Sequence, residues 1–153
     1  MPRFVFRLKP VLEHRERIEK DRQRIFSEKQ RALVEARAEC ARLAAERDDQ
    51  RETLRRDHKT LDVDALRATY AHLAYLDRSI EEQDVRIQAC VAEADAARTR
   101  LVAASRDREV LDTLKIRRRE AFDAEASRVE QRALDDQNAR QFGRAALERG
   151  NPS

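Results

Sequence analysis

Glycine, proline and large aromatic residues are scarce in this chain of 153 residues. It contains two Gly, three Pro, five Phe, two Tyr and no Trp. Proline lies only at positions 2, 10 and 152 and glycine only at 143 and 150, so nothing between Val11 and Phe142 forces a helix to stop. A chain with so few large apolar side chains also lacks the material for a broad globular core.

Residues of the types that form catalytic, metal or cofactor sites are equally scarce. The three histidines, His14, His58 and His72, lie far apart, and none has a second ligand at a spacing typical of a metal site. Two glycines are too few for a phosphate-binding loop. We interpret Cys40 and Cys90 as reduced thiols that fill a small core layer, with a redox switch as the alternative. We therefore expect no enzyme activity, no metal and no cofactor.

Charged residues make up 41% of the chain, with 33 basic and 30 acidic side chains and a net charge of +3. The two signs are intermixed, as on the solvated faces of helices, whereas a nucleic-acid interface requires segregated basic charge. The sequence also has no signal-peptide pattern and no apolar run approaching the roughly 18 residues of a transmembrane helix. We expect a cytoplasmic protein without a nucleic-acid partner.

The stretch from Leu66 to Leu111 carries the clearest pattern in the chain. Apolar or small residues recur in steps of three and four, with charged residues between them. The seam consists of Leu66, Thr69, Leu73, Leu76, Ile80, Gln83, Ile87, Cys90, Ala94, Ala97, Leu101, Ala104, Arg108 and Leu111. A repeat of 3.5 residues keeps one narrow stripe facing a partner helix, so this stretch predicts one strand of a left-handed coiled coil.

The first half of the chain supplies a second stripe. It comprises Val11, Arg15, Ile18, Arg22, Ile25 and Lys29, and then Leu33, Ala36, Cys40, Leu43, Arg47, Gln50, Leu54 and Leu61. Between the stripes, Asp62 or Asp64 can cap a new helix. An antiparallel pairing folded near residue 65 places Cys40 opposite Cys90 and Arg47 opposite Gln83.

These stripes predict an all-α fold, a long two-helix antiparallel coiled-coil hairpin. We expect helix 1 over about 10–60, a turn over about 61–64 and helix 2 over about 65–142. Residues 127–142 have no partner within the chain under this pairing, and 143–153 are expected to form a disordered tail.

Two surfaces stand out as candidates for binding. Tyr70, Leu73, Tyr75, Leu76 and Ile80 form a patch wider than one seam, which predicts either a docking site or a thicker core beside the turn. The run Arg117 to Arg119 is either a contact for an acidic partner or a solvated face. Both alternatives stay open for each surface.

Three segments resemble the flagellar export protein FliJ family. The opening Phe4-x-Phe6-x-Leu8-x-x-Val11-Leu12-x-x-Arg15 resembles that family's N-terminal pattern. The block from Arg106 to Asp136 is similar to a second family motif, most clearly at Glu130-Gln131-Arg132-x-Leu134-Asp135-Asp136, although Arg132 and Asp136 stand where Lys and Glu are usual. The segment Tyr70 to Ile80 is similar to a third.

This resemblance implies a single FliJ-like hairpin domain over residues 1–142 that acts as a non-enzymatic component of the flagellar type III protein export apparatus. Such a protein serves motility and chemotaxis by binding the hexameric FliI-like export ATPase and the FlhA-like export gate, and in some members substrate chaperones. It would lie in the cytoplasm, peripherally on the cytoplasmic face of the cell membrane at the flagellar base.

The resemblance also suggests contact residues. Those for the gate are Tyr70, Leu73, Leu76, Ser79 and Gln83. Those for the ATPase are Phe4, Phe6, Arg117, Arg118, Arg119, Glu130, Gln131 and Asp135. The alternatives are a YscO-like stalk of an injectisome, which shares the hairpin, and a generic structural coiled coil. The F-x-F-x-L opening favours the flagellar member.

Overall fold

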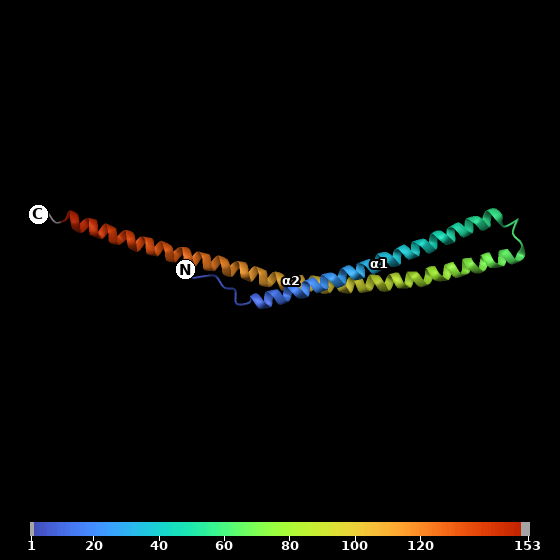
Figure 1. The fold of residues 1–153 in the computed structure, drawn as a ribbon, viewed down its shortest axis with the longest axis horizontal. Coiled ribbons are helices and arrows are strands. Elements are labelled where there is room, and N and C mark those ends of the chain that lie inside the picture. Colours follow the sequence, from blue (N-terminus) through green and yellow to red (C-terminus); the bar gives the residue numbers. More distant parts are fainter. Residues whose placement is uncertain (1, 151–153) are drawn as a thin grey trace. The chain divides into compact units, whose positions relative to one another are not determined.

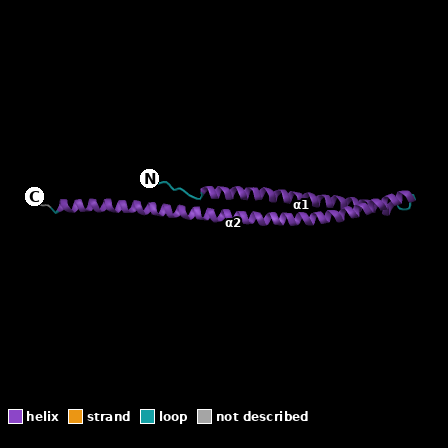
Figure 2. Ribbon diagram, turned by 90° about the horizontal axis from the view of Figure 1, so that it is seen from below, coloured by secondary structure: helices purple, strands orange, loops and turns teal. Residues whose placement is uncertain are grey.

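The computed structural model describes residues 2–150, which form two helices packed against each other. Helix α1 spans Lys9–Asp57 and helix α2 spans Val63–Arg149 (Figures 1 and 2). No strand is present among the residues described. The predicted all-α helical hairpin is therefore confirmed.

The turn between the helices is closed by polar contacts of the backbone. Helix α1 ends when the backbone N–H and the Oγ1 of Thr60 both donate to the carbonyl oxygen of Asp57, at 2.9 and 2.8 Å. Asp62 then caps α2, since its Oδ1 accepts a hydrogen bond from the backbone N–H of Ala65 at 2.7 Å. Of the two predicted caps, the structure selects Asp62. The turn itself lies a few residues earlier than the predicted 61–64.

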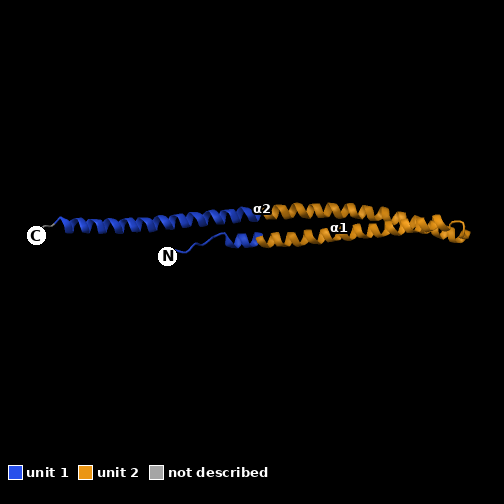
Figure 3. Cartoon of the chain, turned by 90° about the horizontal axis from the view of Figure 1, so that it is seen from above, with its two compact units in different colours: residues 1–15, 107–153 blue, residues 16–106 orange. Residues whose placement is uncertain are grey.

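The chain divides into two compact units (Figure 3). The larger unit, residues 16–106, holds the turn and both helices around it. Its buried residues are Ala36, Leu43, Leu73, Leu76, Ala94, Ala97 and Ala104. Every residue of the predicted α2 seam within this unit is buried or half-buried, which confirms the heptad pattern. Leu76, at 1% exposure, is the most deeply buried large side chain.

The pairing register of the larger unit differs from the prediction by about one heptad. The Sγ of Cys40 contacts Oδ1 of Asp84 at 3.5 Å, and Arg47 pairs with Asp77 at 3.8 Å. The predicted partners, Cys90 and Gln83, lie farther from the turn, so those two pairings were wrong. A seam that repeats every seven residues matches itself again after sliding by one heptad. Apolar spacing alone therefore leaves the register open.

The smaller unit contains residues 2–15 and 107–150 of the described chain. Phe6 and Leu12 are buried at 6% and 3% exposure, while Val11 is 42% exposed. The predicted stripe was therefore wrong at Val11, where Leu12 is the buried residue, whereas its next members from Arg15 to Lys29 are half-buried as predicted. Helix α1 begins only at Lys9, so the residues before it follow no helical register. The packing of Phe6 helps to fix which face of α1 is buried.

Helix α2 continues to Arg149, which corrects the predicted end at 142 and the predicted tail for residues 143–149. One glycine costs a helix only about 1 kcal/mol, and the residues after Gly143 are mostly strong helix formers. Residues 127–142 are all exposed, as the missing partner predicted. The last three tail residues, 151–153, lie outside the described part. The assignment of one domain to 1–142 stays a prediction.

Candidate docking surfaces

The five predicted gate residues separate into two groups. Leu73 and Leu76 are buried at 9% and 1% exposure, and Nε2 of Gln83 donates to the carbonyl oxygen of Ala36 on α1 at 3.0 Å. Tyr70 is 61% exposed, and Ser79 is half-buried. The structure thus places three of the five at the contact between the helices, and their assignment to the gate stays a prediction.

Tyr75 is the residue that the predicted gate set left out. It is 58% exposed, and its ring stacks on His72 with centroids 6.3 Å apart and an interplanar angle of 18°. Nε2 of His72 in turn contacts Oε1 of Glu46 on α1 at 3.3 Å. The signal for Tyr75 was present in the sequence, because the patch was too wide for one seam and some of its rings had to lie outside.

The N-terminal aromatic residues and the basic run meet in the smaller unit. Cζ of Arg118 lies 5.9 Å from the centroid of the Phe6 ring, and Cζ of Arg119 lies 5.4 Å from that of Phe4. These are cation–π distances. The ring of Phe4 also packs against Phe122, with centroids 5.6 Å apart. Four of the predicted ATPase-contact residues therefore form one cluster.

The remaining predicted ATPase-contact residues lie on exposed parts of α2. Arg117 is exposed and has no ion pair among residues 2–150. Nε2 of Gln131 donates to Oδ1 of Asp135 at 3.1 Å, so these two residues form a local pair. Glu130 lies on a different side and lines a pocket. The structure does not gather this second group into one site.

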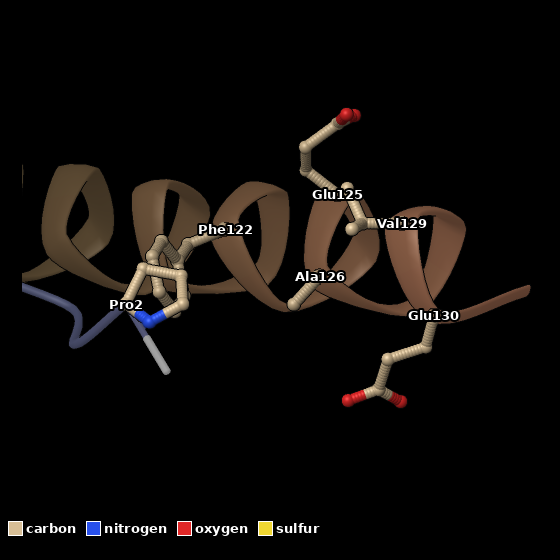
Figure 4. A pocket seen from close by; sticks show the side chains of 6 residues that line it. All are labelled: Pro2, Phe122, Glu125, Ala126, Val129 and Glu130. Carbon is tan, nitrogen blue, oxygen red and sulfur yellow. The ribbon is translucent and has the colours of Figure 1, made fainter. Parts of the chain in front are cut away.

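One of the pockets in the smaller unit, next to Pro2, was not predicted. Its volume is about 210 Å³, and it is lined by Pro2, Phe122, Glu125, Ala126, Val129 and Glu130. In Figure 4 the Pro2 ring lies next to Phe122, and the carboxylates of Glu125 and Glu130 point away from each other. The helical spacing of Phe122, Ala126 and Val129 was visible in the sequence. The proximity of Pro2 was not.

The described residues show neither a metal site nor a membrane span. Among them, no group of three or more His, Cys, Asp or Glu side chains could hold a metal ion. Neither helix over residues 2–150 contains a stretch with the length and hydropathy that a membrane span requires.

Comparison with known proteins identifies the family. Searches of the curated proteins and of the solved structures gave no significant match. The family model described as flagellar FliJ protein matches residues 4–147, which is nearly the whole chain and includes the N-terminal aromatic cluster and both helices except the last two residues of α2. The chain therefore belongs to the FliJ family, whose members are non-enzymatic components of flagellar type III protein export.

Proposed function

We propose that this protein is a coiled-coil stalk that binds the export ATPase ring and links it to the export gate. The observation that carries the proposal is the family match over residues 4–147. Two long helices support it, because a stalk has to be stiff and narrow, and neither helix has a proline after Pro10 in the first turn of α1 or a glycine before Gly143. Such a protein would act on the cytoplasmic face of the membrane at the flagellar base, and it could there receive substrate chaperones.

The smaller unit is the proposed contact for the ATPase. It joins the cluster of Phe4, Phe6, Arg118 and Arg119 to the exposed part of α2 that follows residue 126. Of the described residues after 126, all but one are exposed on this helix, and such a helical surface is available to another protein. This proposed contact also includes four exposed polar residues, Arg117, Glu130, Gln131 and Asp135.

The proposed contact for the gate is the surface of α2 beside the turn, where Tyr70 and Tyr75 lie on two flanks of the helix about 140° apart. Tyr70 and Tyr75 present exposed rings there, and half-buried Ser79 follows one turn later. Exposed tyrosines are common anchors of protein interfaces, because they combine apolar area with a hydroxyl group. In this proposal Leu73 and Leu76 act indirectly, by holding α2 against α1.

Binding to the ATPase is tested with the purified full-length protein and the purified FliI-like ATPase of the same organism. We expect the two proteins to elute together in size-exclusion chromatography, and we expect the rate of ATP hydrolysis to rise when the stalk is added. Separate elution with an unchanged rate would contradict the proposed ATPase contact.

Binding to the gate is tested with the cytoplasmic domain of the FlhA-like protein and the double variant Tyr70→Ala/Tyr75→Ala. Loss of two interface tyrosines is expected to weaken binding about tenfold or more. Val85→Ala is the matched control, because Val85 is 69% exposed on the same helix and away from the tyrosines. Equal affinities of the double variant and the control would rule out this face.

A further inference from the structure

The segment before α1 alternates between side chains that are covered and side chains that are exposed. Its even-numbered residues from Phe4 to Leu8 are buried or half-buried, and the odd-numbered Arg3, Val5 and Arg7 are exposed. Such alternation is typical of an extended segment, in which successive side chains point to opposite sides. The segment therefore presents two arginines with one valine between them, and that valine is 74% exposed.

Helix α2 adds three exposed cations beside this segment. Cζ of Arg118 lies 5.9 Å from the centroid of the Phe6 ring. Cζ of Arg119 lies 5.4 Å from that of Phe4. Lys115 is within about 60° of both arginines around the helix, and all three side chains are exposed. Together with the segment and the first residue of α1 they form a basic patch, which consists of Arg3, Arg7, Lys9, Lys115, Arg118 and Arg119.

No carboxylate falls within the two stretches of chain that form the basic patch. Residues 2–12 carry three basic side chains and residues 113–119 carry four, and neither stretch contains Asp or Glu. Within the described chain, two patch cations have ion pairs, Lys9 with Glu13 at 3.9 Å and Arg119 with Asp123 at 3.6 Å. The other four have no ion pair among residues 2–150.

The basic patch accounts for the net charge of the protein. The carboxylates that border it are Glu13, Asp112, Glu120 and Asp123, and Asp112 is paired with Arg108. When these residues are counted with the patch, there are seven basic and four acidic side chains, a net charge of +3. The whole chain has the same net charge, so the remainder is neutral. The sequence intermixes the two signs, and folding gathers the excess of positive charge at one place.

Cations without an exposed aromatic ring favour a membrane surface as the partner. Protein interfaces depend on aromatic or arginine anchors that enter pockets, and single-stranded nucleic acids stack their bases on exposed rings. Here Phe6 is buried and Phe4 is half-buried, and an arginine lies over each ring. A membrane that contains anionic lipids is a uniformly negative surface, which attracts Lys and Arg without requiring a register.

We propose that the basic patch binds the surface of an anionic lipid membrane. Its cations would contact the phosphate groups of the lipid headgroups, and Val5 would enter the headgroup layer between Arg3 and Arg7. This inference goes beyond the proposed function, because it names a partner other than the ATPase and the gate. Arg3, Val5 and Arg7 lie outside the proposed ATPase contact, so variants at these positions test the membrane contact separately.

The first test measures co-sedimentation of the full-length protein with vesicles of phosphatidylglycerol and phosphatidylcholine in equal parts. We expect Arg3→Glu/Arg7→Glu to bind these vesicles at least about tenfold more weakly than wild type. Arg37→Glu/Arg100→Glu is the matched control, because it changes the net charge equally at two exposed arginines of the larger unit that have no ion pair among residues 2–150. Equal binding of the two double variants would overturn the proposal.

The dependence on lipid and salt distinguishes an electrostatic contact from an apolar one. Wild type is expected to bind the mixed vesicles at low salt, to leave them as salt increases, and not to bind vesicles of phosphatidylcholine alone. Equal binding to both kinds of vesicle would mean that the headgroup charge is not recognised, and it would contradict the role of the basic patch.

A tryptophan at position 5 shows whether this face is the one that meets the lipid. The chain contains no tryptophan, so Val5→Trp introduces a single indole at the centre of the basic patch. We expect its emission to shift to shorter wavelength when the mixed vesicles are added, because tryptophan settles at the level of the headgroups. Val34→Trp is the control at a position of the larger unit that is 63% exposed, and it should not shift. An unshifted Val5→Trp on bound vesicles would assign the contact to another surface.

Two other polyanions are separated by the same variants. If wild type binds a single- or double-stranded oligonucleotide but not the mixed vesicles in the same buffer, the basic patch recognises nucleic acid and the proposal is wrong. If wild type binds neither and Arg3→Glu/Arg7→Glu weakens binding to the purified export ATPase, the patch belongs to an acidic surface of that protein, which also overturns the proposal. The vesicle experiments contain no ATPase, so their failure leaves the proposed function intact.

Discussion

At the scale of single residues, the contact between the helices changes the acidity of the Cys40 thiol. It is half-buried, and its Sγ lies 3.5 Å from Oδ1 of Asp84. Desolvation raises the pKa of the Cys40 thiol above its usual value of 9.0, and the neighbouring carboxylate of Asp84 raises it further, because a thiolate there would be both poorly hydrated and repelled. A raised pKa in the folded state means that this contribution to stability is present below pH 9 and is lost as the pH rises through the folded pKa.

This environment predicts slow alkylation of Cys40, and Asp84→Asn is expected to accelerate it. In a Cys90→Ser background, iodoacetamide modifies only Cys40, and its rate follows the thiolate fraction. Removing the charge of Asp84 should move the pH midpoint of the rate downward and raise the rate at pH 8.5 several-fold. Asp95→Asn, an exposed change elsewhere on α2, is the control. An unshifted midpoint in Asp84→Asn would show that the carboxylate does not act on the thiol.

At the scale of the helices, the start of α2 depends on one side chain. Asp62→Ala removes the hydrogen bond to the backbone N–H of Ala65, and loss of such a cap lowers the free energy of unfolding by about 0.5–2 kcal/mol. Asp62→Asn retains a cap acceptor and is expected to recover most of that loss. Urea denaturation followed by circular dichroism at 222 nm measures both. If Asp62→Ala and Asp62→Asn unfold at the same urea concentration as wild type, the cap contributes nothing.

The helices also show what sequence patterns can and cannot predict. The seam from Leu66 to Leu111 was predicted correctly, because a sustained heptad repeat has one physical explanation. The pairing register was not predicted correctly. When one helix is shifted by about one heptad, so that Cys40 lies near Asp84 and not near Cys90, the apolar residues of the two seams still face each other. Polar contacts across the helices distinguish the two registers, such as Nζ of Lys29 with Oε2 of Glu93 at 3.1 Å. These contacts involve exposed charges, which also abound at positions that make no contact.

At the scale of the whole chain, candidate sites were predicted only in part. Phe4, Phe6 and the arginines after residue 116 were expected in one region, and the structure brings most of them together. The pocket was missed because it joins Pro2 to α2 residues more than a hundred positions later. Leu73 and Leu76 were assigned to a docking face because they lie in an apolar patch, and a patch does not reveal which of its members the partner helix covers.

The end of α2 is exposed. Residues 127–149 make up 23 of the 87 residues of this helix, and all but one of them are exposed. A chain truncated after Ala126 is therefore expected to lose helical signal in proportion to the residues removed, and the urea midpoint of the rest should change little. It is also expected to lose binding to the export ATPase, because it lacks Val129, Glu130 and the following surface.

A chain truncated after Arg149 is the control for this experiment, and it should match wild type in both measurements. A large fall in the urea midpoint of the shorter chain would mean that the end of α2 stabilises the hairpin instead of serving a partner. If the shorter chain still binds the ATPase and its urea midpoint is unchanged, the contact is assigned to the cluster around Phe4 and Arg119. This truncation therefore measures stability and binding independently, because the surface proposed for docking contributes few of the buried residues that hold the helices together.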